Sequence, residues 1–184
     1  MVGSDYGTAV VAALELYLDV DATRRLRTLW RALEAEGVPT LASLQNDQHR
    51  PHVSLAAART LEPEAVVAAL GDLVVGHGLT LDLDFVGQFV GRVLWLGVTP
   101  TEELLSHHRA VHERLTAGGV DVWELYQPGR WVPHCTVSMR VPNPLMAHAL
   151  RRCLEVLPIR ATVIGASVTD HVNGIAHPLG AAAP

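Results

Sequence analysis

The sequence predicts an α+β fold in which one unit of strands and helices occurs twice. Segments with alternating apolar and polar side chains, typical of strands, are interspersed with longer segments of helical periodicity. The order of the elements is strand, helix, strand, helix, strand, strand, and then helix, strand, helix, strand, strand. We therefore expect a single domain over residues 1–184 that consists of two lobes related by a pseudo-two-fold axis.

The first half of the chain begins with a strand over residues 9–19. Glu15 and Tyr17 lie on the face of this strand opposite to the leucines. Asp21 can cap the helix that follows. A second strand is expected over residues 52–58, after a polar and irregular segment.

The next elements form a helix, a hairpin and another helix. Pro63 suits the first turn of a helix that stops near Gly76. Residues 79–85 alternate between apolar and polar side chains, as in a half-exposed antiparallel strand, and residues 92–98 are the expected hairpin partner. A third helix is predicted over residues 101–117, where a pair of glycines ends it.

The last third of the chain repeats this pattern. Residues 120–126 are expected to be a short strand or an extended loop, and residues 134–141 a strand. A fourth helix starts at Asn143, and a strand over residues 159–169 follows it. The Asn-Gly pair at residues 173–174 lies between short apolar runs, which indicates a hairpin.

Two motifs of the form Pro-His-x-Ser/Thr-apolar open two of the predicted strands. Their histidines, His52 and His134, are 82 residues apart. Because side chains alternate between the faces of a strand, Ser54 points the same way as His52, and Thr136 the same way as His134. Two related lobes would place the motif strands side by side, with both histidines in one central groove.

Two imidazoles in one groove offer a general base and a general acid, because imidazole gains or loses a proton near neutral pH. The two hydroxyl groups beside them can donate hydrogen bonds to the non-bridging oxygens of a phosphate. These groups suit the cleavage of a phosphodiester without a metal. The alternative is that both motifs are half-buried strand histidines with hydroxyls nearby and no catalytic role.

The paired motifs resemble those of the 2H phosphoesterase superfamily, which includes bacterial 2′-5′ RNA ligase-like proteins and RNA 2′,3′-cyclic phosphodiesterases. The segment Arg-Trp-Val-Pro-His at residues 130–134 is similar to the family's approach to its second motif. The resemblance implies two antiparallel sheets flanked by helices around a central cleft. It assigns catalysis to His52 and His134 and phosphate stabilisation to Ser54 and Thr136, with no cofactor and no metal.

The resemblance leaves the direction of the reaction and the substrate open. Ligation and hydrolysis use the same groups, so the motifs do not separate a 2′-5′ ligase from a cyclic phosphodiesterase. The substrate can be an RNA end, a small cyclic nucleotide or an ADP-ribose cyclic phosphate. The motifs do not assign the two roles; for hydrolysis we favour His134 as the base and His52 as the acid.

Four further residues are candidates for substrate binding. Tyr126 and Trp131 precede the second motif on an expected loop and could stack on a base. Arg50 and Arg130 could contact phosphate. The alternative role of the two aromatic side chains is packing, and that of the two arginines is a solvated loop charge.

The composition favours a small substrate. The net charge is −5, from 19 acidic and 14 basic side chains, whereas tight non-specific binding to nucleic acid usually needs a basic surface. The pairs Arg24-Arg25 and Arg151-Arg152 lie within helical patterns and are interpreted as solvated helix faces. We expect a monomer that binds a nucleotide with a cyclic phosphate or a short RNA end, but no long duplex nucleic acid.

The sequence shows neither an apolar run long enough to cross a bilayer nor the pattern of a signal peptide. We therefore expect a cytoplasmic protein without membrane contact. Its two cysteines, Cys135 and Cys153, indicate neither a disulfide framework nor a zinc site, which fits a reducing compartment. Cys135 alternates with His134 along the strand and should face the core.

Other functions remain open. His108 and His112 have a spacing that can bind a metal on a helix, but they share an apolar stripe with helix leucines. A metal-dependent hydrolase could use His49, His52 and His134. A catalytically idle nucleotide- or RNA-binding module of the same fold would keep the cleft without turnover.

Overall fold

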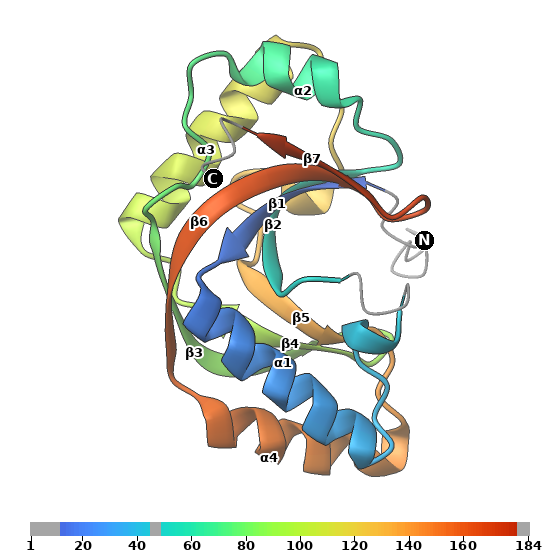
Figure 1. Cartoon of the computed structure of the whole chain (residues 1–184). Helices are drawn as coiled ribbons and strands as arrows, with labels where there is room; N and C mark the ends of the chain where they lie inside the picture. Colours follow the sequence, from blue (N-terminus) through green and yellow to red (C-terminus); the bar gives the residue numbers. More distant parts are fainter. Residues whose placement is uncertain (1–11, 45–48, 180–184) are drawn as a thin grey trace.

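The computed structural model describes residues 12–44 and 49–179, which contain four α-helices and seven strands (Figure 1). The strands are β1 (Ala12–Leu18), β2 (His52–Ala58), β3 (Thr80–Phe89), β4 (Val93–Val98), β5 (His134–Ser138), β6 (Ile159–Asp170) and β7 (Ile175–Leu179). The helices are α1 (Val20–Ala35), α2 (Pro63–Leu70), α3 (Glu102–Ala117) and α4 (Met146–Val156). Their order is the predicted one, which confirms the α+β class. Within the described residues, no helix is long and apolar enough to span a bilayer.

The ends of some elements differ from the prediction. Asp19, not Asp21, caps α1, because its side chain accepts a hydrogen bond of 2.9 Å from the backbone N–H of Ala22. α2 is shorter than predicted, since Gly71 follows it with a φ of 59° and ends the helix. Residues 120–126 form no strand and end in a short 3₁₀ helix.

The described strands join one antiparallel sheet with the order β2-β1-β6-β3-β4-β5, and β7 pairs with β6. The long strand β6 connects the two halves of this sheet. Its residues 159–162 pair with β3, and its residues 163–170 pair with β1. The two separate sheets that we expected are therefore one continuous sheet. The pseudo-two-fold relation between two lobes stays a prediction.

The two motif strands, β2 and β5, stand at opposite ends of this strand order, yet they contact each other. The sheet therefore curls until its two ends meet, and β6 follows this curl as a long arc in Figure 1. α1 packs against α4, and α2 against α3. Figure 1 shows these two helix pairs at opposite ends of the molecule, with the motif strands between them.

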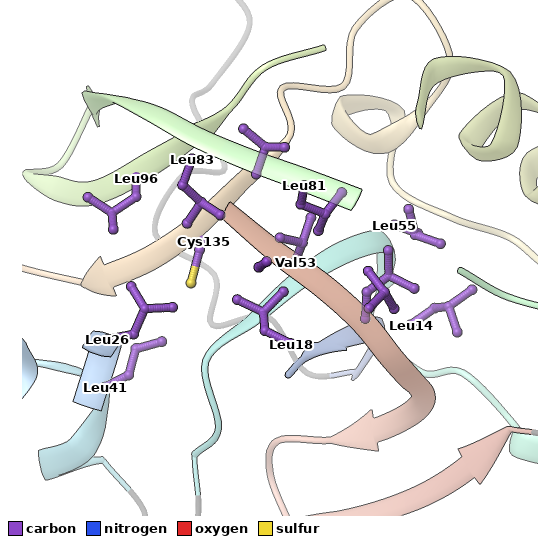
Figure 2. Close-up of a cluster of buried hydrophobic side chains, with 14 of the residues drawn as sticks. Leu14, Leu18, Leu26, Leu41, Val53, Leu55, Leu81, Leu83, Leu96 and Cys135 are labelled. Atoms are coloured by element: carbon purple, nitrogen blue, oxygen red, sulfur yellow. The ribbon is translucent and has the colours of Figure 1, made fainter. Parts of the chain in front are cut away.

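Apolar side chains from both halves form the core against which the motif strands pack. Figure 2 shows Val53 and Leu55 of β2 together with Cys135 of β5, all of them buried. Each such side chain contributes about 1.5–3 kcal/mol through burial. Val53 and Cys135 are the middle residues of the two motifs, so the histidine and hydroxyl on either side of each point to the opposite face. The prediction that Cys135 faces the core is confirmed.

Candidate active site

The two motifs meet in one cavity of about 290 Å³. His52 and Ser54 line it from β2, and His134 and Thr136 line it from β5. The remaining described residues of the lining come from loops and from two short 3₁₀ helices, Leu41–Ser43 and Glu124–Tyr126. They are Leu41, Leu44, His49, Tyr126, Met139 and His171. The fold thus brings together the two imidazole-hydroxyl pairs that the sequence motifs predict.

Each motif histidine is fixed by the same kind of hydrogen bond. Nδ1 of His52 donates to the carbonyl oxygen of Arg50 at 2.7 Å, and Nδ1 of His134 donates to that of Val132 at 2.6 Å. A carbonyl oxygen only accepts, so Nδ1 carries a proton in both rings and the chemistry is left to Nε2. A proline separates each histidine from its carbonyl partner. Proline restricts the residue before it to extended conformations, which explains its place in both motifs.

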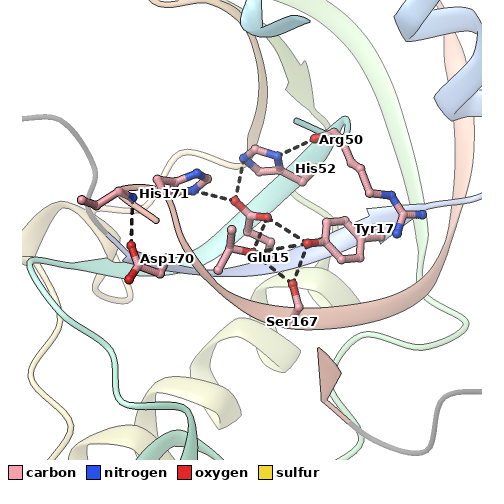
Figure 3. Close-up of polar contacts among 9 residues, drawn as sticks. Glu15, Tyr17, Arg50, His52, Ser167, Asp170 and His171 are labelled. Atoms are coloured by element: carbon pink, nitrogen blue, oxygen red, sulfur yellow. Dashed lines mark hydrogen bonds and ion pairs between the residues drawn. The ribbon is translucent and has the colours of Figure 1, made fainter. Parts of the chain in front are cut away.

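A buried glutamate lies beside His52 (Figure 3). Glu15 of β1 is 2% exposed, and its Oε1 is 3.2 Å from Nε2 of His52 and 2.9 Å from Nε2 of His171. Its other oxygen accepts hydrogen bonds from the hydroxyl groups of Thr169 at 2.9 Å and Tyr17 at 3.3 Å. The carboxylate therefore has polar partners on both oxygens although it is out of contact with solvent.

Glu15 places a negative charge next to His52. Burial alone would raise the pKa of Glu15, but the charges of His52 and His171 and the hydrogen bonds to it bring this pKa down to about 2. The side chain is therefore a carboxylate at neutral pH. Both ring nitrogens of His52 then face acceptors, the carbonyl of Arg50 and the carboxylate of Glu15.

His134 has aromatic neighbours instead. Phe89 meets its ring edge-on at a centroid distance of 4.9 Å, and Trp95 lies at 5.7 Å. Burial away from water and, to a lesser extent, the charge of His52 lower the pKa of His134 to about 4. The ring is therefore neutral at pH 7, with the lone pair on Nε2, as a general base requires.

The difference between the two histidines comes from the strands beside the motifs. In register, Ser54 pairs with Glu15 of β1, whereas Thr136 pairs with Trp95 of β4. The residue that pairs with the motif hydroxyl thus carries a carboxylate beside the first motif and an indole beside the second. Gly87 of β3 leaves room for that indole, because a Cβ atom there would lie 2.1 Å from Trp95. The flanking strands, rather than the motifs, distinguish the two imidazoles.

The predicted aromatic residues lie in different places. Tyr126 lines the cavity, and burial raises its pKa to about 12, so its hydroxyl keeps its proton. Trp131 does not line the cavity: it is buried and stacks on His108 at a centroid distance of 4.0 Å. Its Nε1 donates to the carbonyl oxygen of Ser54 at 3.0 Å. Trp131 therefore supports the backbone of the first motif from outside the cavity.

The two predicted arginines also lie outside the lining of the cavity. Arg130 forms an ion pair with Glu124 on the exposed loop before the second motif. Arg50 holds its guanidinium 4.5 Å from the centre of the Tyr17 ring and lines an adjoining groove. Of the four predicted substrate-binding residues, the structure brings Tyr126 to the histidines.

The sequence patterns did not single out Glu15 or His171. The alternation of β1 places Glu15 on its polar face, which would suit an exposed strand equally well. Pairing β1 with β2 would have revealed that this polar face continues into the histidine motif. His171 follows β6, and its ring lies 5.3 Å from that of His49 and 6.1 Å from that of His52. No sequence signal connects these rings, because the fold brings them together from distant segments.

The helical pair His108 and His112 is buried between α3 and the sheet. Nε2 of His112 is 2.9 Å from the carbonyl oxygen of Leu55, and His108 stacks on Trp131. Burial lowers the pKa of His108 to about 4. In the part of the chain that the structure describes, no group of three or more His, Cys, Asp or Glu side chains is arranged to hold a metal ion.

Comparison with known proteins identifies the family to which this chain belongs. The family model described as the 2′-5′ RNA ligase superfamily matches residues 19–174, and a search of curated proteins finds no match. The fold is similar to that of E. coli LigT in complex with NADP+, with 20% identity, a TM-score of 0.54, and coverage of 92% of this chain and 94% of LigT. A solved phosphoesterase is similar with a TM-score of 0.56 at the same identity and coverage. Since the family model spans most of the chain and both histidine motifs, the protein belongs to the 2′-5′ RNA ligase superfamily, within the 2H phosphoesterases.

Proposed function

We propose that this protein hydrolyses 2′,3′-cyclic phosphodiesters of nucleotides or RNA ends, or acts on 2′-5′ linkages, by general acid–base catalysis with His52 and His134 and without a metal. The observation that carries the proposal is the contrast between two imidazoles across one cavity. His52 lies beside the carboxylate of Glu15, and His134 lies among aromatic rings that keep it neutral. Hydrolysis requires two opposite proton transfers, and this pair supplies one group for each.

In the hydrolytic direction, Nε2 of neutral His134 takes a proton from water, and the water oxygen forms a bond to phosphorus. The bond between phosphorus and one ribose oxygen breaks, and Nε2 of cationic His52 gives its proton to that oxygen. Ser54 and Thr136 donate hydrogen bonds to the non-bridging oxygens, where negative charge accumulates. One turnover leaves His134 protonated and His52 neutral, and proton exchange with solvent restores both.

Glu15 acts in this scheme through His52 and touches no reacting atom, so it is a positioning residue. Its carboxylate faces Nε2 of His52 at 3.2 Å and orients the ring. The hydroxyl groups of Thr169 and Tyr17 hold the carboxylate in place. Burial and the charge of Glu15 raise the pKa of Tyr17, so that this hydroxyl stays a donor.

The cavity has the character of a nucleotide site. Its volume of about 290 Å³ is that of a small ligand pocket. Tyr126, Met139 and Leu41 offer aromatic and apolar contacts to a base or ribose, next to the polar motif residues. E. coli LigT, whose fold is similar, has been crystallised in complex with 3′-AMP and with NADP+. These complexes support a nucleotide as the ligand.

The test is turnover of the four nucleoside 2′,3′-cyclic monophosphates in the presence of EDTA. We expect hydrolysis by the unaltered protein and a loss of at least about a hundredfold in kcat for His52→Ala and for His134→Ala, since each removes one proton transfer. His177→Ala is the matched control, because His177 is exposed on β7 and outside the cavity.

Turnover that survives either motif substitution would contradict the assignment of the site. Folded protein without turnover of cyclic mononucleotides would direct the same test to 2′-5′-linked oligonucleotides and RNA ends. Nucleotide binding without turnover of any of these substrates would favour the idle binding module. Activity that EDTA abolishes would favour the metal-dependent alternative.

A further inference from the structure

A second cavity, of about 600 Å³, adjoins the active-site cavity. His49 lines both cavities, and the segment that carries it leads directly into β2. We name the second cavity the arginine groove. It is defined by the four arginines that line it: Arg24, Arg27, Arg31 and Arg50.

Three of these arginines lie on one face of α1. Arg27 and Arg31 follow Arg24 by three and seven residues, a spacing that places side chains on the same side of a helix. At a rise of 1.5 Å per residue, they extend over about 10 Å. All three are exposed. Arg25 points elsewhere, because its Nη2 donates to the carbonyl oxygen of Val156 at 2.7 Å.

The groove carries an excess of positive charge. Arg24 forms an ion pair with Asp21, but the described residues that line the groove include no carboxylate. Asp19, at the start of α1, accepts hydrogen bonds from the backbone N–H groups of Ala22 and Thr162. The net charge of −5 for the whole chain therefore coexists with a cationic surface next to the active site.

The fourth arginine connects the groove to the catalytic histidine. The guanidinium of Arg50 lies over the ring of Tyr17, 4.5 Å from its centre, while the backbone carbonyl of Arg50 accepts a hydrogen bond from Nδ1 of His52. A guanidinium above an aromatic ring still has N–H donors free for an anion, and their planar arrangement matches phosphate. Val20 and Ile164 add exposed apolar surface to the same groove.

We propose that the arginine groove binds the backbone phosphates of an oligoribonucleotide whose cyclic phosphate end lies in the active-site cavity. The inference rests on the proposed function, and it names an RNA end rather than a mononucleotide as the substrate class. A chain of nucleotides joined to the reacting phosphate has to leave the cavity, and the groove beside His49 offers cationic contacts along a path of about 10 Å. Proteins that bind single-stranded nucleic acid without sequence preference use such combinations of positive charge and flat or apolar surface.

The experiment measures binding separately from turnover. The probe is a 5′-fluorescein octaribonucleotide ending in a 2′,3′-cyclic phosphate, and all variants carry His134→Ala to prevent its hydrolysis. We expect this background protein to bind the octamer at least about tenfold more tightly than adenosine 2′,3′-cyclic monophosphate, measured by anisotropy and by competition. Adding Arg27→Gln and Arg31→Gln should remove most of this advantage and leave the Kd of the mononucleotide within about twofold.

The salt dependence gives a second readout. Each arginine-phosphate contact on a single strand contributes about −0.7 to the slope of log K against log salt. Two lost contacts should flatten the slope by about 1.4, which is about sevenfold in Kd between 50 and 200 mM salt. The matched control is Arg109→Gln with Arg151→Gln, which removes the same charge from exposed positions outside the groove.

The inference is overturned if the groove variant binds the octamer as well as the background does, or if the control loses as much affinity as the groove variant. Displacement of the octamer by octaglutamate as readily as by unlabelled octamer would also overturn it, in favour of an acidic peptide. Absence of turnover in the protein with intact His134 would contradict the proposed function instead, and the binding measurements would still decide on the groove.

Discussion

Glu15→Gln removes one charge from the active site and preserves the shape of the side chain, because the amide oxygen can still accept from Thr169. Oε1 of Glu15 is 3.2 Å from Nε2 of His52. Unit charges about 4 Å apart attract by about 4 kcal/mol at an effective dielectric constant of about 20. The charges are spread over both groups and His171 shares the carboxylate, so we take about half of this energy, about 2 kcal/mol. An energy of this size corresponds to a factor of about 30 in a rate constant.

The assay is the pH profile of kcat/KM for a cyclic mononucleotide. The carboxylate stabilises the positive charge that the proposed general acid carries, so Glu15→Gln should lower kcat/KM by up to about 30-fold, with the larger loss on the alkaline side of the profile. The acidic limb of the profile should stay at the same pH, because it reports the protonation of His134. Glu113→Gln is the matched control, since Glu113 is exposed on α3.

An equal loss of activity at all pH values, with both limbs in place, would refute the reasoning. Glu15 would then support the fold without setting the charge of His52. Urea unfolding of both variants checks that the protein is folded in each assay.

Four further predictions concern the same site. The pKa of His134 is about 4, so kcat/KM should be level from pH 7 to about 5 and should fall as pH decreases through 4; a fall centred near pH 6 would contradict the base assignment. The pKa of Glu15 is lowered from 4.5 to about 2, so the stability that its ionisation provides is complete above pH 4.5 and is lost toward pH 2. Glu15→Gln should reduce the pH dependence of the free energy of unfolding between pH 4.5 and 2, measured with urea. An unchanged pH dependence would contradict this prediction. Ser54→Ala and Thr136→Ala should each lower kcat by about 10- to 100-fold with little change in KM, whereas a change in KM alone would indicate ground-state binding. Trp131→Phe should cost about 1–2 kcal/mol in urea unfolding, because it leaves the carbonyl of Ser54 without its indole donor; no loss would mean that water replaces the donor.

The element order was predictable because strand and helix periods are local properties of the sequence. Alternation identified the motif strand β2 over the residues that the structure assigns to it, and the Asn-Gly pair identified the hairpin of β6 and β7. The joining of the two halves was not predictable, because β6 changes its partner from β3 to β1 partway along its length. That change depends on tertiary packing, and a strand of 12 residues shows no local sign of it.

The site was predictable where its residues lie in a local motif or shortly before one, as Tyr126 does. His52 and His134 each begin a strand and are followed two residues later by a hydroxyl side chain, and this pattern can be recognised from the sequence alone. Trp131 was expected at the substrate because it precedes the second motif, but its ring stacks on α3, which folds against β2 from a distant segment. Arg24-Arg25 was interpreted as a solvated helix face, and the arginine groove was not predicted, for a related reason. A search for adjacent basic residues finds Arg24-Arg25, whereas the groove contains residues three and four apart.

The two motifs are equivalent in sequence, so the motifs alone cannot decide which imidazole gives a proton and which takes one. The decision requires a difference one strand away from each motif, and the curled sheet provides it. β1 contributes Glu15 opposite Ser54, and β4 contributes Trp95 opposite Thr136. His52 lies beside a buried carboxylate, whereas burial lowers the pKa of His134 to about 4, so the two histidines have different surroundings before any substrate binds. We therefore infer that β1 and β4 set the direction of proton transfer in the proposed mechanism, and the pH profile of Glu15→Gln tests this inference without changing either motif.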